Sequence, residues 1–288
     1  MKEKNQYLVG AHVSISGGFY KAIEEGTAIG CTAIQIFTKS NRQWGSKTIT
    51  DHEAQQFIDA QNNSDIKVVV AHASYLINLG STTPGVQEKS LKALVDEIKR
   101  CQQLQIPYLV LHPGTAEADS REASIKETGK LINQALEQTH DCTTTILVET
   151  MAGQGKSIGS TFEELAAILH QVTHKKRIGI CFDTCHAFAA GYDFTTKENY
   201  NSLFKKFDDL IGLEYLKIFH VNDSKKEMGA HVDRHEDIGK GAIKLPAFEM
   251  IMNDHRFAKV SKILETPVTG DAILDYKRNL EMLVSLIK

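Results

Sequence analysis

Several apolar segments of this chain end in a residue that can bind a metal ion. Histidine follows VVVA, YLVL and YLKIF, glutamate follows TTTILV and SKIL, and aspartate follows IGICF. The six end residues are His72, His112, Glu149, Asp183, His220 and Glu265. Neutral imidazole and carboxylate groups are ligands that zinc and related metals accept. Such residues at the ends of buried segments therefore predict a metal centre.

Two further segments add ligands to this set. His186 follows Asp183 by three residues, and we expect it in a tight loop after the strand. Asp183 could instead cap a helix, and His186 could be an ordinary loop histidine. The recurrence of the pattern along the chain favours the metal interpretation. In the sequence DRH, Asp233 and His235 are alternate residues of an extended segment, so both side chains can bind one ion.

The complete set has nine members, which exceeds the roughly four to six ligands of a single ion. We therefore expect two or three ions. Five imidazoles and four carboxylates favour Zn²⁺, with Mn²⁺ or iron as alternatives, whereas Mg²⁺ prefers oxygen ligands and water. Cys185 is a minor competitor for the same site, and His12 is a candidate for a supporting role beside the ligands.

The charge of the chain bears on its substrate. The net charge is −3, whereas proteins that bind nucleic acid are usually basic. Three divalent ions would outweigh the four carboxylates and leave the centre at about +2. This local charge favours an anionic substrate. A polynuclear centre also favours a metal-activated hydroxide that attacks phosphorus in line with the leaving oxygen.

The spacing of the end residues indicates how the chain is organised. Successive members are 34 to 45 residues apart, which is the length of one strand and one helix. We expect strands at 7–13, 33–37, 67–71 and 108–111, and four more that end at Glu149, Asp183, His220 and Glu265. We expect helices at 19–29, 51–62, 84–104, 120–139, 161–170, 197–211, 245–253 and 273–288. A long polar loop spans 221–241.

Eight strands that alternate with eight helices predict a parallel α/β fold. An open, doubly wound sheet is the alternative, but six strand ends of a wide sheet cannot converge on one small site. We therefore expect a closed TIM (β/α)8 barrel, formed by residues 1–288 as a single domain, with its ligands at the C-terminal ends of the strands.

Composition indicates the cellular setting. The five cysteines form no CxxC pair, and the polar N-terminus does not resemble a signal peptide. No apolar run approaches the roughly 20 residues of a membrane span. We therefore expect a cytoplasmic protein with reduced thiols and no membrane association.

The motifs around these residues resemble those of the endonuclease IV family, the zinc-dependent apurinic/apyrimidinic endonucleases of base-excision repair. The resemblance extends from GAHVS at 10–14 to LETP at 264–267. The matching motifs between these are HASYLINLG (72–80), LHPG (111–114), ETMAGQG (149–155), FDTCHAFAAGYD (182–193), HVNDS (220–224) and DRHEDIG (233–239). The resemblance implies a TIM barrel with three zinc ions per chain, with Mn²⁺ as an alternative at one site.

The resemblance also implies how the ligands are shared and what the enzyme does. One ion would have His72, His112 and Glu149 as ligands. A second would have the bridging Glu149 with Asp183, His220 and Glu265, and a third would have His186, Asp233 and His235. Glu149, Asp183 and Glu265 are the implied catalytic residues. The implied reaction is incision of DNA on the 5′ side of an abasic site, which leaves a 3′-hydroxyl and a 5′-deoxyribose phosphate, and removal of blocking groups from 3′ ends.

The same resemblance implies contacts with double-stranded DNA. Arg42 and Gln43 in the loop FTKSNRQW, and Tyr75 and Leu76 after His72, correspond to side chains that are inserted at the lesion. Such wedges unstack bases, and an abasic nucleotide costs least to flip. The structural alternative for Tyr75 and Leu76 is packing under the rim of the barrel. The family more often has Asn followed by Gln or Pro where this chain has Ser40-Asn41. We expect a monomer.

Two other functions compete with this interpretation. Xylose-isomerase-like sugar isomerases share the barrel, but they use fewer metals and need a polar sugar pocket. A non-enzymatic DNA-binding barrel would not need an intact set of ligands. Metal stoichiometry and a nicking assay on abasic duplex distinguish the three.

Overall fold

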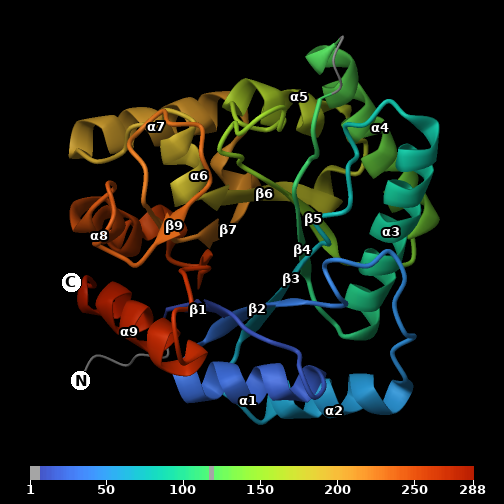
Figure 1. Cartoon of the computed structure of the whole chain (residues 1–288), viewed down its shortest axis with the longest axis horizontal. Coiled ribbons are helices and arrows are strands. Elements are labelled where there is room, and N and C mark those ends of the chain that lie inside the picture. The colour runs from blue at the N-terminus through green and yellow to red at the C-terminus, as the bar shows by residue number, and fades with distance from the viewer. Residues whose placement is uncertain (1–6, 117–119) are drawn as a thin grey trace.

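Strands and helices alternate along the chain as the sequence predicts. The structure is a computed structural model that describes residues 7–116 and 120–288. Eight parallel strands close into a barrel (Figure 1). The barrel strands are β1 (Val9–His12), β2 (Ala33–Phe37), β3 (Val68–His72), β4 (Tyr108–Leu111), β5 (Thr145–Glu149), β6 (Ile178–Asp183), β7 (Leu216–His220) and β10 (Ser261–Leu264). The predicted TIM barrel is confirmed.

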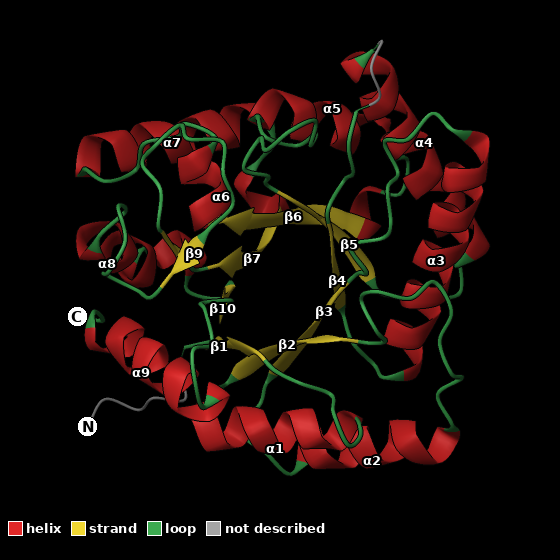
Figure 2. Cartoon of the chain, viewed as in Figure 1, coloured by secondary structure: helices red, strands yellow, loops and turns green. Residues whose placement is uncertain are grey.

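Helices form the outer layer around these strands, as Figure 2 shows. They are α1 (Phe19–Ile29), α2 (Asp51–Asn62), α3 (Pro84–Gln103), α4 (Arg121–Gln138), α5 (Phe162–Gln171), α6 (Thr184–Ala189), α7 (Lys197–Leu210), α8 (Leu245–Asn253) and α9 (Ala272–Ser285). Short 3-10 turns at Lys175–Arg177, Leu213–Tyr215 and His255–Phe257 precede β6, β7 and β10. Helix α9 packs against α1, which closes the outer layer beside the β1–β10 seam. Within residues 7–116 and 120–288, no helix is long and apolar enough to cross a membrane.

Local signals fix the boundaries of several helices. Thr50 Oγ1 accepts a hydrogen bond from the Glu53 backbone N–H at 3.2 Å, and the Glu53 carboxylate accepts one from the Thr50 N–H at 2.8 Å. This capping box begins α2, and a cap of this kind contributes about 1 kcal/mol. Gly30 ends α1 in the left-handed region, at a φ of 94°. Because these signals lie in the local sequence, both helices have their predicted bounds.

The segment after β6 differs from the prediction. The sequence predicts a tight loop around His186, whereas the structure has the short helix α6. The Asp183 carboxylate accepts a hydrogen bond from the His186 backbone N–H at 2.7 Å and so caps this helix. The capping role of Asp183 and its position among the predicted ligands therefore coexist.

The long loop at 221–241 also has more order than the sequence predicts. It contains an antiparallel pair of two-residue strands, β8 (Asp223–Ser224) and β9 (His235–Glu236). The buried Asp223 carboxylate accepts hydrogen bonds from the backbone N–H groups of Ser224, Gly239, Gly241 and Ile243 at 2.8 to 3.0 Å. These contacts fold the loop back on itself and hold His235 at the mouth of the barrel.

Inward-facing side chains fill the barrel in layers. One layer is apolar and contains Ala33, Val70, Val110, Leu147, Cys181, Ile218 and Ile263. Side chains alternate across a strand, so the next inward position lies two residues further along each one. One polar residue from each barrel strand, or from the residue directly after it, occupies that next layer: His12, Gln35, His72, His112, Glu149, Asp183, His220 and Glu265. We call these eight residues the polar ring.

Candidate metal centre

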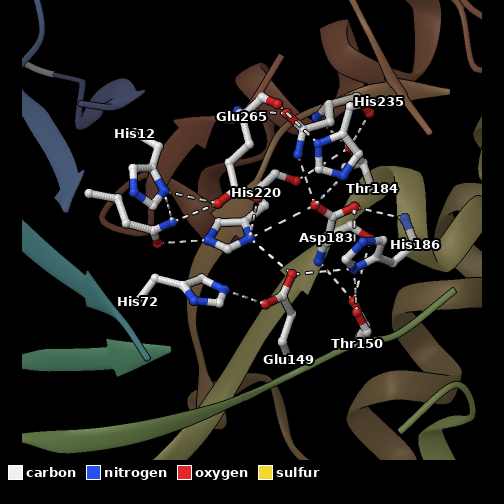
Figure 3. A network of polar contacts seen from close by, with 12 residues as sticks. His12, His72, Glu149, Thr150, Asp183, Thr184, His186, His220, His235 and Glu265 are labelled. Carbon is white, nitrogen blue, oxygen red and sulfur yellow. Dashed lines mark hydrogen bonds and ion pairs between the residues drawn. The ribbon is translucent and has the colours of Figure 1, made fainter. Parts of the chain in front are cut away.

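The nine predicted ligands lie together at the C-terminal mouth of the barrel. Figure 3 shows most of them, with their side chains directed toward one another. Together with Cys185, they form four groups in which the ligand atoms lie within 4.8 Å of one another: His72–His112–Glu149, Glu149–Asp183–His220–Glu265, Asp183–His186–His235 and Cys185–Asp233–His235. Six of the nine belong to the polar ring, and α6, the long loop and β9 bring the other three beside it.

Glu149 lies at the middle of the cluster. Its Oε2 is 3.3 Å from His72 Nε2 and 3.1 Å from His112 Nε2. Its Oε1 is 3.1 Å from Nδ1 of His220. Each carboxylate oxygen therefore faces a different group of imidazoles, which is the arrangement that a bridging ligand between two ions needs.

The groups around Asp233 differ in part from the set that the family resemblance implies. Asp233 Oδ2 is 3.2 Å from His186 Nε2, and its Oδ1 is 3.3 Å from His235 Nε2. By mutual distance of their ligand atoms, however, His186 and His235 form one group with Asp183, and Asp233 forms another with His235 and Cys185. Burial raises the pKa of the Cys185 thiol to about 12. Because the thiolate is the form that binds metals, Cys185 is a weaker ligand than its carboxylate neighbours.

Backbone carbonyl groups orient three of the imidazoles. Nδ1 of His72, His186 and His235 each donates to a carbonyl oxygen, and the acceptors are Ala73 at 2.8 Å, Thr150 at 2.9 Å and Glu265 at 3.0 Å. A carbonyl oxygen cannot donate, so the proton of each ring is on Nδ1. The Nε2 lone pair of each ring is therefore directed toward the cluster, as a metal ligand requires.

A side chain orients His220 in the opposite sense. His220 Nε2 lies 2.8 Å from Gln35 Oε1. The Gln35 amide nitrogen donates to Glu265 Oε1 at 2.7 Å and lies 3.0 Å from His12 Nδ1. The carboxylate must accept, so the amide oxygen faces His220 and receives its Nε2 proton. This leaves the lone pair of His220 on Nδ1, which points at Glu149.

The electrostatics of the cluster fit bound cations. Burial would raise the pKa of Glu149, but the imidazoles of His220 and His112 outweigh it and hold that pKa well below its usual range. His186 Nε2 and His235 Nε2 are buried and, within the described part of the chain, make no hydrogen bond, although oxygens of the Asp233 carboxylate lie 3.2 and 3.3 Å from them. Divalent ions between these atoms and the carboxylates would give both ring nitrogens a partner and would neutralise the buried negative charge. The donor set therefore fits transition-metal ions.

Of the four predicted DNA-contacting residues, Tyr75 lines the cleft over this cluster, whereas Gln43 lines a separate cleft with Lys39 and Arg100. A cleft of about 370 Å³ is lined by His72, Tyr75, His112, His186, Asp233, His235 and Glu265. Tyr75 is 55% exposed, and its ring contacts the rings of Phe37, His72 and His112 at centroid distances of 5.3 to 5.6 Å. Leu76 is half-buried, and Arg42 and Gln43 are exposed on the loop after β2.

Comparisons with known proteins agree with this geometry. The family described as xylose isomerase-like TIM barrel matches residues 23–286. A protein of Geobacter sulfurreducens named "Probable endonuclease 4" is 45% identical over 284 residues, which are 99% of this chain and 95% of that protein. A protein of Trichlorobacter lovleyi with the same name is 46% identical and covers 98% of this chain and 100% of its own length. The chain belongs to the endonuclease IV family.

Solved structures separate the family from its wider fold group. Endonuclease IV from Thermus thermophilus has a TM-score of 0.84 and 33% identity, over 96% of this chain and 98% of that protein. A D-tagatose 3-epimerase-like protein has a TM-score of 0.73 over 96% of this chain and 97% of its own, but only 19% identity, which shows a common fold alone. Membership of the endonuclease IV family makes the chain a DNA-repair hydrolase, as the sequence predicts, and the sugar-isomerase alternative is disfavoured.

The sequence interpretation missed residues that support the ligands. Gln35 is one, and Asn222 is another, because its Nδ2 donates to Asp183 Oδ2 at 2.8 Å and its Oδ1 accepts from the Glu265 N–H at 2.7 Å. A polar residue at an inward position of the apolar strand AIQIF is a signal that could have identified Gln35. His12, which the sequence suggests as a supporting residue, lies 3.3 Å from Glu265 Oε1 and within hydrogen-bond distance of Gln35.

Proposed function

We propose that this member of the endonuclease IV family cleaves the DNA backbone on the 5′ side of abasic sites and also removes blocking groups from 3′ ends. The products of incision would be a 3′-hydroxyl and a 5′-deoxyribose phosphate. The observation that carries the proposal is the convergence of five imidazoles and four carboxylates at one mouth of the barrel. Three divalent ions, with zinc the best fit to these donors, would be held there.

The protein residues have separate tasks in this reaction. Bound ions would supply an activated water and would stabilise negative charge on the attacking and leaving oxygens. Glu149 would join two of the ion positions, because each of its oxygens faces a different set of imidazoles. Asp183 and Glu265 would complete the catalytic carboxylates. With three ions the centre would have a charge of about +2, which attracts a phosphodiester.

The loops around the cleft would select the damaged nucleotide. Tyr75 is exposed beside the predicted ligands, so it and Leu76 could fill the space that a flipped nucleotide leaves in the duplex. Arg42 and Gln43 would enter from the neighbouring loop. The cleft of about 370 Å³ is near the lower limit of ligand pockets, which are about 300–1,000 Å³. A sugar-phosphate without a base suits such a volume, and an abasic nucleotide is the least costly to flip.

Two measurements test this function. Protein prepared without chelators should contain close to three transition-metal ions per chain by elemental analysis, and it should nick a duplex with a single abasic site. A reproducible content near one ion, or isomerisation of a sugar with no nicking, would contradict the proposal. A cytoplasmic monomer that folds as a single barrel domain belongs to the same proposal, and size-exclusion chromatography checks the monomeric state.

A further inference from the structure

A buried carboxylate lies beneath the two loops that carry the proposed DNA contacts. The Glu97 side chain, on α3, is 1% exposed. Its Oε2 accepts a hydrogen bond from Thr38 Oγ1 at 2.5 Å, and its Oε1 accepts one from the Ser74 backbone N–H at 3.3 Å. Thr38 is the first residue after β2, and Ser74 follows β3 by two residues. One side chain therefore binds both loops at their bases.

Neighbouring residues of α3 fix the loop at 38–47 to the same helix. Arg100 Nε donates to the Thr38 carbonyl oxygen at 3.1 Å, and its Nη1 donates to the Lys47 carbonyl oxygen at 2.8 Å. The buried Lys39 ammonium is 2.8 Å from Asp96 Oδ2 and 3.7 Å from Glu97 Oε1. Both ends of this loop are held on α3, and the segment with Arg42 lies between them.

Ser74 extends these contacts to the second loop. Its hydroxyl donates to the Asn41 carbonyl oxygen at 3.0 Å and is 3.3 Å from the Leu76 backbone N–H. Asn41 directly precedes Arg42, and Leu76 directly follows Tyr75. The Ser74 hydroxyl therefore joins the backbone directly before Arg42 to the backbone of Leu76, and Glu97 accepts a hydrogen bond from the N–H of the same serine.

We propose that Glu97 is a positioning residue that fixes the loop carrying Arg42 and Gln43 relative to the loop carrying Tyr75 and Leu76. This inference rests on the proposed function. The two loops follow different strands, so their relative position is not set by the covalent chain over a short distance. A buried carboxylate binds its donors without competition from water. Preorganised loops lose less conformational entropy when they bind, so both wedges can engage one lesion together.

Two substitutions distinguish the hydrogen bonds that Glu97 makes to the two loops from its negative charge. Glu97→Ala removes both hydrogen bonds, while Lys39 keeps Asp96 as its partner. In Glu97→Gln, the amide oxygen can accept from the Ser74 N–H and the amide nitrogen can donate to the Thr38 hydroxyl, so both ties persist. Glu88→Ala changes an exposed glutamate on the same helix and is the matched control.

The main readout is affinity for DNA at one fixed salt concentration. The full-length, metal-loaded protein is titrated with a duplex that contains a stable abasic analogue and with the same duplex undamaged. We expect Glu97→Ala to weaken binding to the abasic duplex about tenfold, since ordering the loops is then left to the binding step. Glu97→Gln and Glu88→Ala should keep the native affinity. Metal content and Tm are measured for each variant.

A double-mutant cycle tests the coupling between the loops directly. With Glu97 present, the loss of affinity for abasic duplex in the double variant Arg42→Ala/Tyr75→Ala should differ from the product of the two single losses by about threefold or more. In the Glu97→Ala background, the loss in the double variant should equal the product of the two single losses within about twofold. A general decrease in the stability of the fold would not remove the coupling between Arg42 and Tyr75, so its loss in Glu97→Ala would identify the positioning role.

Three results would overturn the inference. The first is an unchanged affinity and an unchanged cycle in Glu97→Ala. The second is an equal loss on damaged and undamaged duplex. The third is native protein that does not prefer the abasic duplex, which would also overturn the proposed function, whereas the first two would leave that function intact. If Glu97→Ala does not fold, Thr38→Val removes one tie while keeping the shape of the side chain, and the same expectations apply to it.

Discussion

Replacement of Gln35 by methionine tests whether this residue orients the ligands of the centre. Gln35 is fully buried in β2, and it contacts His220, Glu265 and His12 at 2.8, 2.7 and 3.0 Å. Methionine has a similar length and no amide, so Gln35→Met keeps the packing and removes all three contacts. The Nε2 proton of His220 then has no acceptor, and its ring is no longer held with Nδ1 toward Glu149.

The expected cost follows from these contacts. A buried N–H group that loses its acceptor costs about 1–3 kcal/mol, and each 1.4 kcal/mol corresponds to about a tenfold change in affinity. We therefore expect the ion held by His220 to bind roughly 10- to 100-fold more weakly, which agrees with the effect of residues that orient metal ligands elsewhere. Binding at the ion positions proposed near His112 and Asp233 should change less, because Gln35 does not contact those side chains.

A chromophoric chelator measures this effect as the number of ions released at increasing chelator concentration. Gln35→Met should release one ion at a lower concentration than the native protein, while Gln55→Met, the same change on the exposed side of α2, should not. Tm is measured with and without metal. An equal fall of Tm in the metal-free and metal-loaded forms would assign Gln35 to packing alone, and native metal retention would refute its orienting role.

Three other predictions address the site and the fold. Glu149→Gln should reduce single-turnover nicking by about 10²-fold or more, because it removes a charge between two ion positions; unchanged nicking would refute the bridging role. Tyr75→Ala combined with Leu76→Ala should weaken binding to abasic duplex by about 1–3 kcal/mol per lost contact and should impair removal of 3′ blocking groups less, with unchanged metal content. Equal losses on both substrates, or a loss of metal, would instead indicate that these residues support the rim. Burial lowers the pKa of Lys262 from 10.5 to about 8, so between these pH values the unfolded chain binds more protons than the folded chain and stability rises with pH. Urea unfolding should show that Lys262→Met removes this rise, and a preserved slope would contradict the assignment.

Much of the fold follows from local sequence signals. The bounds of β2, β4, α1, α2 and α8 agree with the prediction, because the two strands are short, bounded apolar runs and the three helices have an apolar period with a local start or stop signal. Helix α6 was not predictable in this way, because six residues are too few for a helical period. The β8–β9 pair depends on the buried Asp223 carboxylate and on four backbone groups that follow it in the chain, which are contacts that no local pattern encodes.

The site residues at the ends of strands could be predicted from the sequence. Residues that belong to the site only because of the direction of their side chains could not. All nine predicted ligands lie in the cluster, although their roles as ligands stay predictions. Gln35 was missed because the ligand prediction used residues at the ends of apolar runs, and the strand of Gln35 continues for two more residues. An inward-facing position is defined by the period of two and by the register between strands. The register β2–β3 pairs Gln35 with Val70 rather than His72, and this stagger appears only in the closed barrel.

The polar ring has a consequence for the synthesis of the protein. Every barrel strand, or the residue directly after it, contributes one member of the ring, and the His12–Glu265 contact crosses the seam where β1 meets β10. A nascent chain emerges from the ribosome in sequence order, so the earlier strands are available before their last partner exists. The complete set of donors then forms only when β10 takes its place beside β1 and β7. Loading of the proposed ions would therefore follow translation of the last strand, and the newly made enzyme would depend on the metal supply that it meets at that moment.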